Sequence, residues 1–268
     1  MRAGLALFFS AATSLAAGQG LEYPVDVAVD EKGAVYVADN LAHALFKLAN
    51  GTVQVVARGE GLPRTPLFGI RHIAPDRTDG VWIASDPATM KLYRIDASGN
   101  IQPIADDDRF VAPWGVAVEP SGAILAVDRV THRLRRVTAD GVEDVAEVRA
   151  PRTILLGEDN AIIVLTDRNL VRVGEDGKAT PLLESPPFEF PHDAVLHPDG
   201  NYYVSDGYAR AIWRVTPAGN VTALIQGDPL QSPQGLTLDG NGSLLVADPH
   251  AKNVFLVSAK GEVKVLLP

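Results

Sequence analysis

The sequence predicts an all-β fold, namely a six-bladed β-propeller with four antiparallel strands per blade. Three observations support this fold class: one short motif recurs six times, the recurrences are evenly spaced, and no long stretch has helical periodicity. The motif is an apolar residue, then a small residue, Thr or Val, and then Asp. It occurs as Val37-Ala38-Asp39, Ala84-Ser85-Asp86, Ala126-Val127-Asp128, Leu165-Thr166-Asp167, Val204-Ser205-Asp206 and Val246-Ala247-Asp248.

The spacing of the six aspartates has the length that a propeller blade requires. Successive aspartates are 47, 42, 39, 39 and 42 residues apart. Four strands of about five residues each, together with their turns, fill a period of about 42 residues. Parallel-sheet units are excluded because no helix of about 10–15 residues separates the strands.

Each repeat has the same four expected strands in the same order. The first follows a Pro or a loop, as at 24–29, and ends in a Gly-bearing turn such as 31–33 or 120–122. The second strand ends in the motif aspartate. The third follows a loop, as at 45–48 and 212–215, and a second Gly turn leads to a short fourth strand, as at 53–56. The aspartates are expected to be structural, because a carboxylate at this position accepts backbone N–H groups of the loop that follows.

The repeats divide the chain almost without remainder. Their expected ranges are 21–61, 62–109, 110–150, 151–187, 188–229 and 230–268, and the fourth is shortened in its loop at 167–170. Two closures of the ring fit these boundaries. The first and last blades dock directly, or a strand near 13–17 completes the last blade.

The first 17 residues have the pattern of a secretory signal. Arg2 is followed by an apolar stretch over 5–15, which is too short to span a bilayer, and small residues follow at 16–17. We therefore expect a signal peptide at 1–17, a single propeller at 18–268, and export to the periplasm or the extracellular space. A strand or helix of the fold is the alternative interpretation of this segment.

Composition excludes several classes of protein. Hydrophobic residues make up 46% and charged residues 21%, as in globular proteins. The formal net charge is −9, which disfavours nucleic acid as a partner because its phosphates are bound by basic surfaces. The chain has no cysteine, so disulfides and thiolate metal sites are excluded. No other apolar run is long enough for a membrane span in the mature chain.

The repeat motif Pro-x-Gly/Asp-Val-Ala-Val-Asp-x-x-Gly-x-Val-Tyr-Val-Ala-Asp, seen at 24–39, resembles the NHL repeat. The resemblance extends over 21–268 and implies the NHL-type six-bladed propeller superfamily. Its relatives include peptidyl-amidoglycolate lyases, regucalcin-like lactonases of the SMP-30/gluconolactonase type, streptogramin lyases, sensor domains and binding domains. Because one fold serves all these roles, function has to be argued from the site.

The resemblance also implies where a site lies. In the metal-dependent relatives, the residue after the Pro that opens the first strand points into the central channel. Aligning the six repeats at this position gives Val25, Arg71, Trp114, Arg152, His192 and Gln234. The residues that follow them are Asp26, His72, Gly115, Thr153, Asp193 and Gly235.

The metal sites of these relatives are only partly present. Pro191-His192-Asp193 resembles the Pro-His-Asp of the amidoglycolate lyases, but one of three expected histidines is present at this register and His72 lies one residue away from it. Catalytic zinc usually has three protein ligands. The lactonase and streptogramin-lyase patterns are not matched. A divalent cation, Ca²⁺ or Zn²⁺, stays an expectation from the resemblance alone.

Three functions are compatible with these residues, and the first is a binding module. Arg71, Arg152 and His192 would converge on a small anionic ligand, or on a peptide or protein partner, because Arg offers a fork of donors to carboxylate and phosphate. Trp114 would supply a stacking wall and Gln234 a hydrogen bond, while Asp26 and Asp193 would orient His72 or His192. If the arginines and aspartates pair with one another instead, they only hold the ring together.

The second function is a diverged metal-dependent lyase or lactonase. There His192 would be a metal ligand or general base, Arg71 or Arg152 would stabilise a developing anion, and Asp193 would orient the histidine. The third function is an assembly scaffold that uses rim loops, above all the long connection at 58–68.

Overall fold

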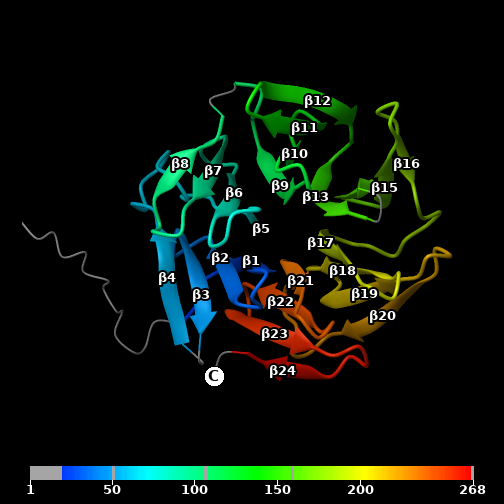
Figure 1. Ribbon diagram of the computed structural model, residues 1–268. Coiled ribbons are helices and arrows are strands. Elements are labelled where there is room, and N and C mark those ends of the chain that lie inside the picture. The colour runs from blue at the N-terminus through cyan, green and yellow to red at the C-terminus, as the bar shows by residue number, and fades with distance from the viewer. Residues whose placement is uncertain (1–19, 50–51, 106–107, 158–159, 267–268) are drawn as a thin grey trace, which may run out of the picture.

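The computed structural model describes residues 20–266 except 50–51, 106–107 and 158–159, and shows six β-sheets arranged in a ring (Figure 1). Each sheet has four antiparallel strands that follow one another along the chain. The predicted six-bladed propeller is therefore confirmed, and each blade falls within its predicted repeat.

The strands have four positions in the blades, numbered from the channel outwards. The innermost strands are β1 (Pro24–Val29), β5 (His72–Pro75), β9 (Pro113–Val118), β13 (Pro151–Leu156), β17 (Pro191–Leu196) and β21 (Leu236–Leu238). The second strands are β2 (Val35–Asp39), β6 (Trp82–Asp86), β10 (Ile124–Asp128), β14 (Ile162–Thr166), β18 (Tyr202–Asp206) and β22 (Leu244–Asp248). The third strands are β3 (Ala44–Ala49), β7 (Lys91–Ile95), β11 (Arg133–Thr138), β15 (Leu170–Val173), β19 (Ala211–Val215) and β23 (Asn253–Val257). The outermost strands are β4 (Thr52–Arg58), β8 (Ile101–Pro103), β12 (Gly141–Glu147), β16 (Ala179–Pro181), β20 (Val221–Gln226) and β24 (Val263–Val265).

The strand register defines two faces of the ring. The first residue of β1, Pro24, pairs with Asp39 at the end of β2, and Pro113 of β9 pairs with Asp128 in the same way. The loops between second and third strands therefore lie at the same edge as the connections between blades. We call this edge the mouth face. The tight turns that join strands one to two and three to four form the opposite side, the turn face.

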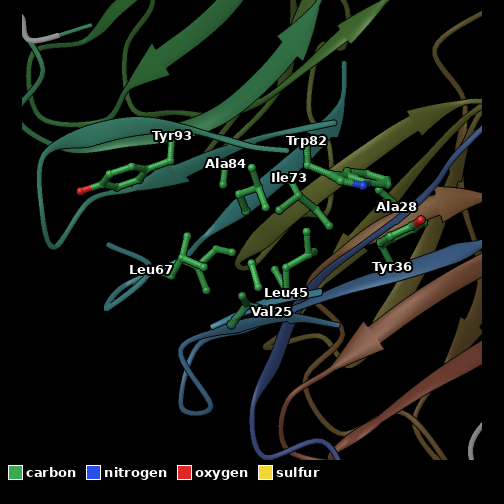
Figure 2. Packing of buried hydrophobic residues seen from close by; sticks show 13 residues of the cluster. Val25, Ala28, Tyr36, Leu45, Leu67, Ile73, Trp82, Ala84 and Tyr93 are labelled. Carbon is green, nitrogen blue, oxygen red and sulfur yellow. The ribbon is translucent and has the colours of Figure 1, made fainter. Parts of the chain in front are cut away.

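Apolar layers between neighbouring blades hold the ring together. Between the first two blades, Val25 and Leu45 pack against Ile73, Trp82 and other buried side chains (Figure 2). Trp82 is fully buried, and burial of a side chain of this kind stabilises the fold by roughly 1.5–3 kcal/mol. Successive side chains of a strand point to opposite faces of the blade, and both faces are covered by neighbouring blades, as for Trp82 and Ile83.

The motif aspartates cap the loops as the sequence predicts. Asp39, Asp86, Asp128, Asp206 and Asp248 are fully buried. Asp128 shows the arrangement: its carboxylate accepts backbone N–H groups of Val111, Ala112, Val130 and Thr131 at 2.6–3.0 Å. One carboxylate thus joins the connection that enters a blade to the loop within it.

The fourth blade corrects the expected alignment by one residue. Thr166, and not Asp167, pairs with Pro151 at the end of the second strand. The hydroxyl of Thr166 accepts the N–H groups of Arg168 and Asn169 at 3.2 and 2.9 Å, while 43% of the Asp167 side chain is exposed. In this shortened loop a hydroxyl reaches the N–H groups that a carboxylate caps in the other blades.

The ring closes by direct docking of the first and last blades. The last sheet draws all its strands, β21 to β24, from one end of the chain, and Val27 of β1 packs with Leu245 of β22. No added strand is needed. The predicted signal peptide at 1–17 lies outside the described residues. Within the described part, no helix has the length and apolar character to cross a membrane.

Candidate functional site

Five of the six channel-facing residues that the sequence predicts meet at the mouth-face end of the channel. Val25, Arg71, Trp114, His192 and Gln234 surround one small space of about 10 Å³. They meet because each innermost strand starts at the mouth face, and the register places the residue after the opening Pro at the channel. The mouth is therefore filled by side chains that contact one another.

Arg71 is the centre of this contact network. Its Nη1 donates to Gln234 Oε1 at 2.6 Å, and its Nη2 lies 2.9 Å from His192 Nδ1. The guanidinium also lies over the Trp114 ring at 4.7 Å from the ring centre, and Arg129 lies 4.9 Å from the centre of the same ring. Stacking on aromatic rings is favourable for guanidinium groups and leaves their N–H donors available.

Arg152, the sixth predicted residue, takes part through a second aromatic ring. Its guanidinium lies 4.4 Å from the centre of the Phe190 ring, and the Arg152 residue is 1% exposed. Its buried Nε has no hydrogen-bond partner. Phe190 contacts His192 edge-on and stacks on Tyr208, of which 73% is exposed. We call Arg71, Trp114, Arg129, Arg152, Phe190, His192 and Gln234 the mouth cluster.

Among the described residues, the guanidinium groups of the mouth cluster have no ion-pair partner. Within the described part of the chain, no carboxylate oxygen lies within 4.0 Å of the nitrogens of Arg71, Arg129 or Arg152. Burial lowers the pKa of Arg71 to about 10. Burial, together with the charges of Arg129 and Arg71, lowers the pKa of Arg152 to about 10. The lowered pKa values mean that nearby negative charge does not make up for the loss of hydration of these two guanidinium groups.

The same charges keep His192 neutral. Burial lowers its pKa well below the usual range, and the charges of Arg71, Arg152 and Arg129 lower it further. Since Arg71 donates to Nδ1, the neutral ring carries its proton on Nε2. The mouth therefore offers three cations, a neutral imidazole and two aromatic walls.

A buried triad lies one residue deeper in the channel. Asp26, His72 and Asp193 come from β1, β5 and β17, so the triad links three blades. The Nδ1 atom of His72 lies 3.7 Å from Asp26 Oδ2, and its Nε2 lies 3.7 Å from Asp193 Oδ1 and 3.0 Å from Thr153 Oγ1. The predicted orientation by the two aspartates thus falls on His72, whereas His192 is held by Arg71.

The triad has the geometry of a metal-binding group, because one ligand atom from each residue lies within 4.8 Å of the others. Without a metal, its carboxylates favour a proton on His72. Although burial opposes the charged ring, the carboxylates of Asp26 and Asp193 raise the pKa of His72 to about 9. The imidazole is therefore protonated at neutral pH, whereas a metal ligand has to be unprotonated. The positive charge of Arg71 would also repel a metal cation bound at the triad.

The aspartates of the triad also serve the scaffold. Asp26 accepts the N–H groups of Val27 and, in the next blade, Ile73 at 2.9 and 2.7 Å. Asp193 accepts those of Ala194 and Leu236 at 2.8 Å each. Each carboxylate therefore joins two neighbouring innermost strands, which fixes the triad rigidly.

Two glycines at the triad level let the blades approach. A Cβ atom on Gly115 would lie 2.5 Å from the Arg152 carbonyl oxygen, and one on Gly235 would lie 2.4 Å from the Cα of Asp26.

Beyond the triad the channel widens into a cavity of about 360 Å³, which extends along the innermost strands as far as Glu31 and Arg77 at the turn face. The triad and the mouth cluster separate this cavity from the mouth face.

The functional roles of the predicted site residues stay predictions, but their placement is clear. The sequence pattern placed two successive residues of each first strand at the channel, and the structure brings them together as two layers. Pattern analysis missed Arg129, Phe190 and Tyr208, which lie in loops where the repeat has no fixed residue. One signal was present: Arg129 is a large basic residue at a loop position where four other blades have an uncharged residue. These residues are Asn40, Pro87, Gly207 and Pro249.

No protein-family model matches the chain. Among solved structures, virginiamycin B lyase from Staphylococcus aureus is similar, with 21% sequence identity over 93% of this chain and 87% of that chain and a TM-score of 0.70. A gluconolactonase from Xanthomonas campestris has 14% identity over 92% of this chain and 87% of that chain, with a TM-score of 0.75. An auxiliary nutrient binding protein from Bacteroides thetaiotaomicron has 14% identity over 88% of this chain and 68% of that chain, with a TM-score of 0.68.

The chain has the six-bladed propeller fold of these proteins. The expected six-bladed propeller fold is thereby confirmed. At these identities the likeness concerns the backbone, and it includes lyases, gluconolactonases and a binding protein. Any function therefore has to be inferred from the side chains of the mouth cluster and the triad.

Proposed function

We propose that this propeller is a binding module that recognises a carboxylate-bearing ligand with an apolar or aromatic body at its mouth cluster. One observation carries the proposal: three guanidinium groups converge on the mouth without a carboxylate partner among the described residues. Together with the protonated His72, these cations face the two carboxylates of the triad, and Arg152 is also attracted by Asp167 and Asp206. A bound anion would pair with the guanidinium groups that have no carboxylate partner among the described residues.

The ligand would contact the half-buried guanidinium groups of Arg71 and Arg129, which lie against the Trp114 ring. Arg152 would add charge from behind Phe190, and the exposed Tyr208 would cover the apolar body of the ligand. His192 supports binding over proton transfer, because an imidazole whose pKa is strongly lowered is a weak base at neutral pH.

Titration calorimetry with N-acetylphenylalanine, with its uncharged amide and with inorganic phosphate tests the proposal. We expect N-acetylphenylalanine to bind, the amide to bind at least about tenfold more weakly, and the affinity to fall with added salt. Arg129→Gln should weaken binding about tenfold, because it removes a charged hydrogen-bond donor whose side chain makes no described hydrogen bond. Arg172→Gln, on the exposed side of β15, is the matched control. Absence of binding by all three probes at millimolar concentration would overturn the proposal.

A metal-dependent lyase or lactonase is the second candidate, and the geometry of the triad favours it. In that case Asp26, His72 and Asp193 would hold a divalent cation, which would supply Lewis-acid chemistry at the channel. Elemental analysis of the purified protein, with thermal shifts against Ca²⁺ and Zn²⁺, decides between the candidates. Stoichiometric metal that is lost in His72→Gln, together with hydrolysis of a lactone, would replace the binding module by the enzyme.

We further propose that the protein acts outside the cytoplasm, in the periplasm or the extracellular space, since residues 1–17 have the pattern of an export signal. Mass spectrometry of the protein from a secreting host tests this. An N-terminus near residue 18 supports export, and an intact N-terminus in the cytoplasmic fraction contradicts it.

A further inference from the structure

The exposed apolar side chains of this protein are concentrated on the mouth face. Seven large apolar side chains are exposed among the described residues, and six of them lie in mouth-face loops or connections. They are Leu41, Leu62, Met90, Val111, Val130 and Tyr208, with 40–73% of each exposed. The seventh, Val265, lies on the outermost strand β24. The turn face has none of the seven.

Five of these residues form an arc over the first three blades. Leu41 and Leu62 come from segments that pack together, since Gly59 donates to the His43 carbonyl at 2.8 Å. Val111 and Val130 both donate their N–H groups to Asp128. Met90 lies two residues after Ala88, which packs against the connection between the first two blades at Gly69. We call Leu41, Leu62, Met90, Val111 and Val130 the apolar arc.

The arc is held in place rather than loosely attached. The connection that carries Leu62 is fixed by Asn40, whose side chain donates to the Ile70 carbonyl at 3.0 Å, and by His43, which lies 2.9 Å from the Phe68 carbonyl and stacks on the Phe68 ring. Leu67 in the same connection is fully buried. An apolar surface that is preorganised in this way binds a partner at a lower entropic cost.

The arc is continuous with the mouth cluster. Val130 follows Arg129, whose guanidinium lies over Trp114, and Arg129 N–H donates to the carbonyl of Ala112 next to Val111 at 3.0 Å. Exposed apolar side chains over three blades, beside three cations that have no ion-pair partner among the described residues, match a partner that is both apolar and anionic. A small ligand in the mouth leaves the arc uncovered, because the arc extends over three blades.

We propose that the mouth face docks a polypeptide whose C-terminal carboxylate enters the mouth cluster while its preceding apolar residues cover the apolar arc. The inference rests on the proposed anion binding and names the kind of ligand. A free C-terminus supplies the carboxylate that the arginines lack. The chain that leads to it supplies side chains that reach from the mouth over Val111 and Val130 towards Leu62. The aromatic pair of Phe190 and Tyr208 forms the opposite wall.

Two fluorescein-labelled libraries of apolar hexapeptides test the inference, one with a free C-terminal carboxylate and the other with a C-terminal amide. We expect selection on the immobilised protein to enrich peptides only from the carboxylate library. In fluorescence anisotropy, Leu62→Ser combined with Val130→Ser should weaken the enriched peptide about fivefold or more, because two exposed apolar contacts are removed. The affinity for N-acetylphenylalanine should not change. Val265→Ser is the matched control, since it removes an exposed apolar side chain elsewhere.

The outcomes separate this inference from the proposed function. If N-acetylphenylalanine binds but the double variant leaves peptide binding unchanged, the docking surface is wrong and the anion site stands. Equal enrichment from the amide library would overturn the role of the carboxylate. Sedimentation that shows a dimer of the wild type but a monomer of the double variant would assign the arc to a second copy of this chain and overturn the inference. If neither the peptides nor N-acetylphenylalanine bind, both proposals fall.

Discussion

At the scale of single residues, His72 is the most constrained group in the channel. Its ring lies between carboxylates of two blades, 3.7 Å from Asp26 and from Asp193, and contacts Thr153 as well. The aspartates raise its pKa to about 9 from an ordinary value of about 6.5. A histidine whose pKa is raised by folding stabilises the folded state. The stabilisation is complete at pH values below the ordinary pKa, and it is lost as the pH rises through about 9.

We therefore predict that the wild type loses stability between pH 8 and pH 9.5 and that His72→Gln loses less. The difference should be about 1 kcal/mol in the free energy of unfolding. The window starts above the pKa of Asp26, which burial raises to about 7, and ends below the pKa of Arg71, which burial lowers to about 10. Urea unfolding at the two pH values measures it. Parallel pH profiles of both proteins would contradict a charged His72.

At the scale of the element, the motif aspartate holds together the loops of five blades, and Thr166 does so in the fourth. Asp128 accepts four backbone N–H groups, which lower its pKa despite the opposing effect of burial. We predict that Asp128→Ala destabilises the protein by about 3–5 kcal/mol, since it leaves several buried donors unpaired. Asp167→Ala, in the blade where Thr166 has the capping role, should change stability by less than about 0.5 kcal/mol. Equal losses in thermal unfolding would show that the register correction is mistaken.

The same elements show how far the repeat pattern predicts structure. Strand-forming residues, turn glycines and the period together predict all six blades, because local turn chemistry and alternation agree with the global ring. The pattern failed by one residue at Thr166, since Asp167 also satisfies the motif and only the pairing with Pro151 distinguishes them. Arg129, Phe190 and Tyr208 were missed because loops obey no period, and their meeting at the mouth depends on the packing of three blades.

At the scale of the whole molecule, the sequence was compatible with two ways of closing the ring. The last blade takes β21 to β24 from the C-terminal part of the chain, and β1 and β2 dock against β22 through Val27, Val37, Leu245 and Ala247. The apolar layer that seals the ring is thus of the same kind as the layer between the first two blades.

This closure predicts unequal effects of shortening the chain at its two ends. A protein that starts at residue 20 should keep the melting temperature of the full chain within about 1 °C, because every strand of the described ring is retained. A protein that ends at residue 258 loses β24, which pairs with Phe255 of β23, and uncovers the seal to the first blade where Leu266 packs. We expect it to melt at least about 5 °C lower, since the loss exposes an unpaired strand edge and apolar surface. Calorimetry of both proteins measures this. A large loss on N-terminal shortening alone would mean that residues before 20 contribute to closure, and the alternative ring with an added N-terminal strand would then replace direct docking.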